Sequence, residues 1–187
     1  MEEKYQIEKQ YKIVITGPES TGKTELTQLL AAHYGGVVVP EFAREYVESL
    51  DGRYTYNDVV SIAEEQLRKR ELTGFEPAGM IFFDTELLIT KVWFEEVFNS
   101  CPEWLPKKVK EPFADFYLLC SPDIPWEDDP VRENGGEMRE YLFNRYREEL
   151  EENCFSYFIV SGKNEIRLRN AINGINKFLN DQGKILN

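Results

Sequence analysis

One octapeptide constrains this chain more than any other segment. Residues 17–24 read GPESTGKT and fit the phosphate-loop pattern G-x-x-x-x-G-K-[ST]; they are Gly17, Pro18, Glu19, Ser20, Thr21, Gly22, Lys23 and Thr24. The two glycines allow backbone conformations closed to other residues, so that successive N–H groups turn inward around an anion. In this pattern Lys23 reaches the β- and γ-phosphates of a nucleotide, and the Thr24 hydroxyl ligates Mg²⁺. The octapeptide therefore predicts a nucleotide-phosphate site in which Lys23 faces solvent until a ligand binds.

The residues on either side supply the context that such a loop requires. Residues 11–16 (YKIVIT) read as a short apolar strand. Residues 25–34 (ELTQLLAAHY) carry apolar side chains at helical spacing, among them Leu26, Leu29 and Leu30. A helix after the loop aims its positive end at the anion. The alternative, a glycine-rich turn that binds nothing, does not account for this order of strand, loop and helix.

The rest of the chain alternates between apolar strands and amphipathic helices. The apolar runs predict further strands at 37–39, 80–84, 116–120 and 157–160. Helices are predicted at 42–50, from Thr55 or Asn57 to 73, and at 87–99, 137–152 and 164–180. The segment 102–112, which contains proline and lysine, is left without an assigned structure, and 122–136 reads as a polar loop. Strands that are apolar throughout indicate a parallel sheet covered on both faces. We therefore predict one three-layer α/β domain over 1–187, with its core at about 11–180.

Composition limits the classes of partner. The formal net charge is −12, from 22 basic and 34 acidic residues, which argues against nucleic acid or an anionic membrane as a bulk partner. No apolar run approaches the roughly 20 residues of a membrane span, and the N-terminus has no signal-peptide core. Three cysteines far apart suit reduced thiols, so we expect a cytoplasmic protein. The single histidine, His33, makes a histidine metal site improbable and is expected at the surface.

Two carboxylates follow the predicted strand at 80–84. Asp84 ends this strand, at the place where a carboxylate beside a phosphate loop holds the Mg²⁺ shell. The alternative is that Asp84 caps the following helix. Glu86 either shares the metal site or favours the positive end of that helix.

A third carboxylate, Glu41, follows the strand at 37–39 in the segment PEFARE. The carboxyl ends of adjacent parallel strands line the ligand crevice in doubly wound sheets, so Glu41 is expected to face the acceptor and to orient or deprotonate its hydroxyl. Arg44 lies one helical turn later and is a candidate to bind the same acceptor. A surface pair between Glu41 and Arg44 is the alternative.

A polar segment at about 122–138 has the features of a lid. It carries Arg132, has Gly135-Gly136 as a hinge candidate, and is followed by Arg139. A mobile arginine-bearing lid excludes water and neutralises charge that develops on a transferring phosphate. The alternative is a solvated run of charges.

Two classes of phosphate-loop protein lack their signatures here. A GTPase carries D-x-x-G after its third strand and N-K-x-D for guanine, whereas this chain reads DTEL at 84–87 and NKFL at 176–179. A transporter ATPase carries L-S-G-G-Q, which is absent from the sequence. A compact kinase with an acceptor crevice and a lid remains.

At this point four segments together resemble a known family. GPESTGKT, PEFARE, FFDTE and WEDDPVR, in this order and spacing over about residues 11–180, resemble the ribosylnicotinamide kinase domain of bacterial bifunctional NAD-salvage proteins. The resemblance implies a P-loop kinase fold with strand order 2-3-1-4-5. It also implies ATP- and Mg²⁺-dependent phosphorylation of the 5′-hydroxyl of nicotinamide riboside. The chain lacks the histidines of the adenylyltransferase signature, so we expect the reaction to stop at the mononucleotide.

The resemblance also assigns residues. It places the phosphates on Lys23 and the loop, Mg²⁺ on Thr24 and Asp84, and the ribose on Glu41, with Glu41 or Asp84 as the base. It makes Arg132 and Arg139 lid residues. Candidates to stack on the nicotinamide ring are Phe42, Tyr46, Tyr54, Tyr56, Trp93 and Trp126. Two other hypotheses stay open: a kinase of another nucleoside, nucleotide or small alcohol, and a nucleotide-binding switch with slow hydrolysis.

Overall fold

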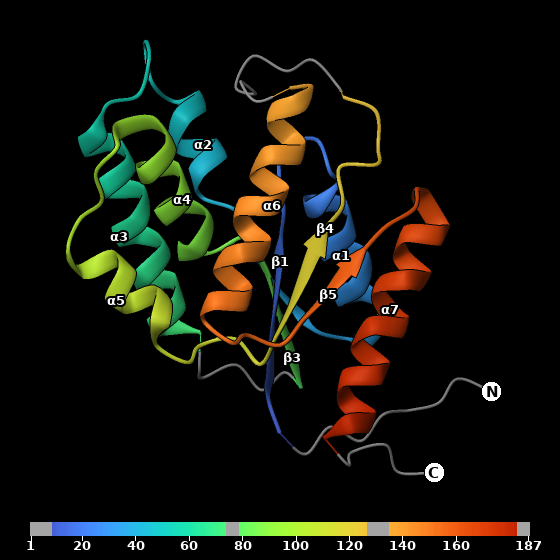
Figure 1. Cartoon of the computed structure of the whole chain (residues 1–187). Coiled ribbons are helices and arrows are strands. Elements are labelled where there is room, and N and C mark those ends of the chain that lie inside the picture. The colour runs from blue at the N-terminus through green and yellow to red at the C-terminus, as the bar shows by residue number, and fades with distance from the viewer. Residues whose placement is uncertain (1–8, 74–78, 127–134, 183–187) are drawn as a thin grey trace.

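A parallel sheet forms the centre of the molecule (Figure 1). The computed structural model describes residues 9–73, 79–126 and 135–182. Within these ranges the sheet has five strands: β1 (Tyr11–Thr16), β2 (Val37–Val39), β3 (Met80–Asp84), β4 (Phe116–Cys120) and β5 (Tyr157–Val160). Their order is β2-β3-β1-β4-β5, and every neighbouring pair is parallel. The expected strands and the order implied by the resemblance are both confirmed.

Helices cover both faces of this sheet. They are α1 (Lys23–Tyr34), α2 (Ala43–Glu48), α3 (Tyr56–Leu72), α4 (Leu87–Phe98), α5 (Trp104–Lys110), α6 (Glu137–Glu152) and α7 (Asn164–Asp181). One face packs against α1 and α7, and the other against α3, α4, α5 and α6 (Figure 1). No helix in the described part of the chain has the length and apolar character needed to cross a membrane.

Side-chain alternation along β1 divides the core between these two faces. Ile13 and Ile15 pack toward α1 and α7, whereas Val14 between them packs toward α3, α4 and α6. All three are fully buried. Removing a side chain of this size from water stabilises the fold by about 1.5–3 kcal/mol. The central strand therefore joins both halves of the core, as its largely apolar sequence predicts.

Two helix starts show how local chemistry sets the boundaries. Thr55 caps α3 through its side chain and forms a reciprocal capping box with Asp58, which settles the choice between Thr55 and Asn57. The short helix α5, in contrast, lies within the segment 102–112, to which the sequence analysis assigned no structure. Pro106 is the third residue of α5, where a backbone N–H has no helical partner to lose.

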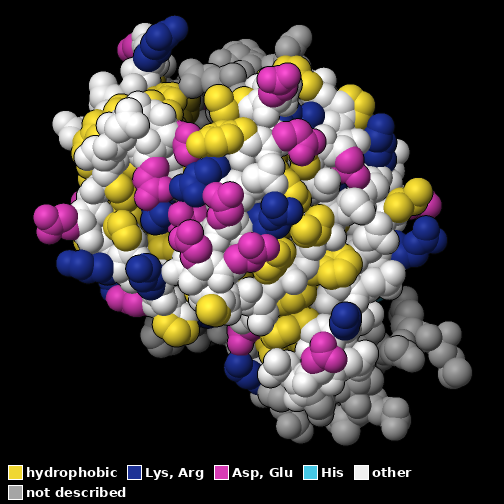
Figure 2. Space-filling model, in the orientation of Figure 1, with side chains coloured by type: hydrophobic (Ala, Val, Ile, Leu, Met, Phe, Trp, Pro, Cys, Tyr) yellow, Lys and Arg dark blue, Asp and Glu magenta, His cyan; other side chains and the backbone are white. Residues whose placement is uncertain are grey.

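Ion pairs join α4 to α6 on the face drawn in Figure 2, where acidic and basic side chains intermingle. The Lys91 ammonium contacts the buried carboxylate of Glu149, and Arg145 contacts Glu95 and Glu96. These contacts hold α6 against α4. Both helices contribute residues to the cavity beside the phosphate loop.

Strand register brings the expected site residues to one edge of the sheet. Asp84, at the end of β3, lies across from Ile15 of β1. Ile15 in turn is only two residues before Gly17, where the phosphate loop begins. Glu41 follows β2, which pairs with β3 on its other side. Because parallel strands end at the same edge, the phosphate loop, Asp84 and Glu41 come together there.

Candidate functional site

The loop between β1 and α1 has the strained backbone that its two glycines allow. Gly17 has φ 140°, and a Cβ atom added there would lie 2.7 Å from the carbonyl oxygen of Cys120 in β4. Gly22 has φ 70° and caps α1. Ser20 is also left-handed, with φ 54°. The loop is therefore wound tightly against the sheet, with α1 beginning directly at Lys23.

Inside the loop, two side chains bond to the same carbonyl. The Thr21 hydroxyl donates to the Pro18 oxygen at 2.8 Å, and the Lys23 ammonium donates to it at 2.9 Å. Lys23 is half-buried rather than facing solvent, so that expectation is wrong. The lysine is thus already positioned within the loop that is expected to hold the anion.

The end of β3 forms the most distinctive pair in the site. The Thr24 hydroxyl donates to Oδ2 of Asp84 at 2.6 Å. Asp84 is only 3% exposed, and its buried Oδ1 has no hydrogen-bond partner among the described residues. Burial raises the pKa of this carboxyl, although the Thr24 hydroxyl and the charge of Lys23 act the other way. A buried carboxylate with one oxygen unused is costly unless a cation or donor completes it.

This pair fits an Mg²⁺ ion that would take most of its ligands from nucleotide phosphates and water. Mg²⁺ takes one or two protein oxygens in such sites, and Thr24 and Asp84 offer one hydroxyl and one carboxylate. Among residues 9–73, 79–126 and 135–182, no cluster of three or more His, Cys, Asp or Glu side chains could hold a metal alone. The donor set therefore suits a nucleotide-bound magnesium ion rather than a metal held by protein alone.

Glu86 serves the helix rather than the metal site. Its carboxylate accepts from the backbone N–H of Leu88 at 3.0 Å and caps α4. Burial raises the pKa of Glu86. Thr85, between the two carboxylates, has φ 69°, a rare conformation for a β-branched residue. This turn separates Asp84, which faces Thr24, from Glu86, which faces its own helix, so Asp84 is not the helix cap.

A cavity of about 500 Å³ extends from the phosphate loop between the helices α2, α3, α4 and α6. Glu41 and Arg44 line it, as the sequence predicts. Burial raises the pKa of Glu41; the charge of Lys23 lowers it, and that of Asp84 raises it further. Arg44 is exposed and pairs with Glu48 at 2.8 Å. The Asp84 carboxylate at the end of β3 is therefore close enough to affect the protonation of Glu41.

Of the expected stacking candidates, Tyr54 and Trp93 line this cavity, with their rings edge to face at 4.8 Å. Tyr56 packs against Phe94 and Phe98 in the core. The other candidates have contacts elsewhere: Phe42 with Lys69, the Tyr46 hydroxyl with Asp58, and Trp126 with Gly135 and the guanidinium of Arg139.

Three lining residues carry no signal in the sequence. Gln66 on α3 and Thr90 on α4 are hydrogen-bonded to each other, and Tyr146 on α6 is buried beside them in the lining. Each occupies an ordinary helical position. Only the packing of three helices separated by many residues brings them to one cavity.

The two arginines predicted for the lid differ in what the structure describes. Arg132 and the rest of residues 127–134, within the segment 122–138, lie outside the described residues. Arg139 is 6% exposed, and its guanidinium donates to the carbonyl oxygens of Glu19, Ser20 and Ile124. A swing over the phosphate would break these three bonds. In this structure Arg139 is therefore bonded to the backbone of the loop and does not reach over it.

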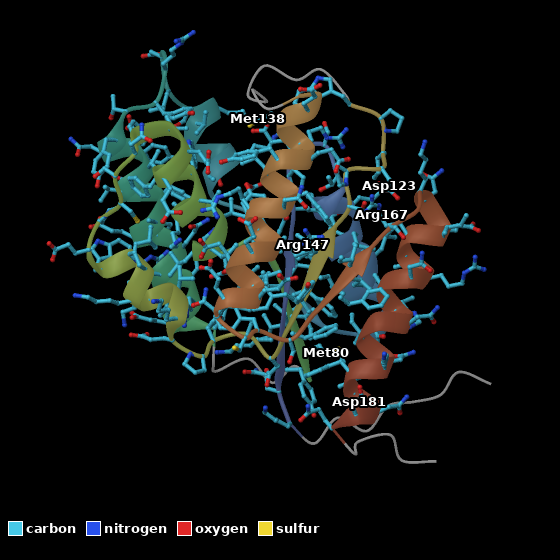
Figure 3. All side chains as sticks on the ribbon, in the orientation of Figure 1. Met80, Asp123, Met138, Arg147, Arg167 and Asp181 are labelled. Atoms are coloured by element: carbon cyan, nitrogen blue, oxygen red, sulfur yellow. The ribbon has the colours of Figure 1, made fainter. Side chains whose placement is uncertain are left out.

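A second buried arginine ties the ends of β4 and β5 together. Arg167 donates to Asp123 at 2.6 Å and to the carbonyl oxygens of Ser121, Val160 and Gly162. Figure 3 shows Arg167 and Asp123 side by side beyond these strand ends. The partners of Arg167 are thus residues 121, 123, 160 and 162, whereas those of Arg139 include Glu19 and Ser20 of the phosphate loop.

Comparisons with known proteins agree with this fold. A family model described as an AAA domain matches residues 12–167. The chain is similar to the trifunctional NAD biosynthesis/regulator protein NadR of Escherichia coli (strain K12), with 26% identity over 153 residues, which is 79% of this chain and 37% of that protein.

Two solved structures extend the comparison. A NadR protein in complex with NR matches at TM-score 0.74 and 21% identity, over 90% of this chain and 50% of that chain. A deoxyadenosine kinase from M. mycoides matches at TM-score 0.63 and 15% identity, over 89% of this chain and 99% of that chain. The chain spans half or less of the NadR proteins, and at these identities the structural likeness is one of fold.

Proposed function

The chain belongs to the AAA domain family, and from that membership and the geometry of its site we propose that it is an ATP- and Mg²⁺-dependent kinase of nicotinamide riboside. Its product would be nicotinamide mononucleotide. The observation that carries the kinase proposal is the Thr24–Asp84 pair at the phosphate-loop end of the cavity. A metal-binding pair, a phosphate loop and an acceptor-sized cavity in one place are what phosphoryl transfer needs.

The protein's own groups then have distinct tasks in the transfer. The loop N–H groups and Lys23 hold the phosphates of ATP. Thr24 and Asp84 would hold Mg²⁺, which neutralises charge on the phosphates when bound. The acceptor hydroxyl oxygen attacks the γ-phosphorus, the bond to the β,γ-bridging oxygen breaks, and ADP leaves. Arg132 is proposed to close over the γ-phosphate.

Glu41 is the better placed of the two carboxylates to take the acceptor's proton. Asp84 already accepts from Thr24, whereas Glu41 lines the cavity beyond the phosphate loop. The raised pKa of Glu41, caused mainly by burial, makes it a stronger proton acceptor than an exposed glutamate. We propose that Glu41 binds the ribose hydroxyl and receives its proton.

Three features support nicotinamide riboside as the acceptor. The four-segment resemblance points to it, and a NadR structure in complex with NR shares the fold. The cavity also offers Tyr54 and Trp93 to a planar cation, a contact that contributes about 0.5–2 kcal/mol. A kinase of another nucleoside is the second candidate, because a deoxyadenosine kinase has the same fold.

A nucleoside panel tests this proposal. With Mg·ATP, nicotinamide riboside should be phosphorylated with a higher kcat/KM than thymidine, uridine or adenosine, measured by ADP release and by identification of the product. If another nucleoside exceeds it tenfold, the kinase proposal stands with a different acceptor. ATP hydrolysis that no acceptor accelerates would instead favour a nucleotide-binding switch.

Glu41→Gln is expected to impair use of the acceptor while ATP binding stays nearly unchanged. Loss of one general base lowers turnover by about 10²-fold. The measurement is a comparison of acceptor kcat and KM with the ATP dissociation constant, and Glu64→Gln, at an exposed position on α3, is the matched control. Weaker ATP binding with normal acceptor kinetics would show that Glu41 has been placed wrongly.

A further inference from the structure

Arg139 contacts the phosphate loop from its outer side. From the first turn of α6, its Nε donates to the Glu19 oxygen at 3.2 Å and its Nη2 to the Ser20 oxygen at 2.8 Å. Its Nη1 donates to Ile124, in the segment after β4, at 2.9 Å. One guanidinium therefore joins the loop, α6 and the connection that leaves β4.

The two loop carbonyls determine where the neighbouring N–H groups point. In a trans peptide the C=O and the following N–H are directed oppositely. Holding the Glu19 and Ser20 oxygens toward Arg139 therefore directs the N–H groups of Ser20 and Thr21 away from it. Both of these residues line the cavity, on the side where phosphate oxygens are expected.

The chemistry of this contact suits arginine and no other side chain. Its planar fork presents five N–H donors in fixed directions, whereas a lysine has a single ammonium at the end of a flexible stem. The side chain is 6% exposed, and the Trp126 ring centroid lies 5.9 Å from its guanidinium carbon. The fork is thus held rigid and brings a buried positive charge next to an anion site.

We propose that Arg139 is a positioning residue, which presets the phosphate loop by fixing the Glu19 and Ser20 peptides with their N–H groups toward the nucleotide phosphates. This inference rests on the proposed function only in that the loop binds a phosphate chain. It needs no particular acceptor. It assigns Arg139 an effect on phosphate affinity that is present before any lid closes.

The experiment measures binding of inorganic tripolyphosphate and of ATP by calorimetry. Arg139→Met should weaken both by about the same factor, on the order of 10- to 100-fold for two charge-assisted hydrogen bonds. Arg139→Lys should lie between this variant and the wild type. Arg167→Met is the matched control, because Arg167 is equally buried and also bonds carbonyls, but those of residues 121, 160 and 162. Its tripolyphosphate affinity should stay within about twofold of wild type.

A rescue measurement separates positioning from general stability. In Arg139→Ala, added guanidinium at millimolar concentration should restore part of the tripolyphosphate affinity, while methylammonium should not. If Arg139→Met does not fold, Arg139→Lys decides the question, because it keeps the charge and the stem but loses the guanidinium fork. Normal tripolyphosphate affinity in a folded Arg139→Met protein overturns the proposal, as does an equal loss in Arg167→Met.

The same data separate this inference from the proposed function. Tripolyphosphate binding that depends on Arg139, in a protein that phosphorylates no nucleoside, would support the positioning role and refute the kinase. Nucleoside phosphorylation in a protein whose tripolyphosphate affinity does not depend on Arg139 would support the kinase and refute the positioning role. A wild-type protein that binds neither tripolyphosphate nor ATP would refute both.

Discussion

Lys23→Ala is expected to lower the kcat/KM of phosphoryl transfer by at least about 10³-fold, the upper value for loss of one preorganised electrostatic group. Its ammonium is half-buried and already lies within the loop, bonded to the Pro18 oxygen. It therefore needs only a short movement to meet the phosphates. ADP release with the preferred acceptor measures the effect.

The fold should survive this change. One hydrogen bond to a carbonyl contributes about 0.5–1.5 kcal/mol to stability, or a few degrees in Tm for a domain of this size. Lys107→Ala, on the exposed side of α5, is the control for loss of a lysine charge. Near-normal turnover in a folded Lys23→Ala protein would exclude the phosphate loop as the site of transfer.

Asp84→Asn is expected to reduce kcat by about 10²–10³-fold and to raise the Mg²⁺ concentration needed for half-maximal rate. The reason is the loss of the carboxylate that accepts from Thr24 and that we propose as a ligand of Mg²⁺. A magnesium titration at saturating ATP measures both quantities. An unchanged magnesium requirement would show that Asp84 does not hold the metal.

The same substitution should stabilise the metal-free protein at neutral pH. The pKa of Asp84 is raised in the folded state, mainly by burial, so the folded protein binds a proton more tightly than the unfolded chain. Ionisation at neutral pH therefore costs stability, and acidification through the raised pKa restores it. Asp84→Asn should raise Tm at pH 7.5 without Mg²⁺, and the gain should vanish as the pH falls below the ordinary aspartate value of 3.8.

Asp58→Asn is the opposite control. Hydrogen bonds from Thr55 lower the pKa of Asp58, so its charged form favours the folded state above the ordinary aspartate pKa. This variant should lower Tm at neutral pH, and the difference should fade on acidification through the pKa of the folded state. A lower Tm for metal-free Asp84→Asn at pH 7.5 would mean that the buried carboxylate stabilises the fold.

Local signals in the sequence determined the strands of the sheet, the phosphate loop and the position of two carboxylates beside it. The strands are mostly apolar, because a parallel sheet covered on both faces buries nearly every side chain of its central strands. The phosphate loop is equally local, since Gly17, Gly22 and Lys23 act within a few residues of one another. Asp84 and Glu41 were predicted as well, because residues that end adjacent parallel strands must meet at one edge.

Only the tertiary structure decided which side chains support and line the site. The sequence singled out Arg139 only as a lid residue, and its hydrogen bonds to the carbonyls of Glu19 and Ser20, more than a hundred residues away, appear only in the folded chain. Gln66, Thr90 and Tyr146 come from three helices and meet only when those helices pack on the sheet. Spacing along one element predicts which face a residue occupies. What that face contacts depends on the long-range packing of the other elements, which no local pattern contains.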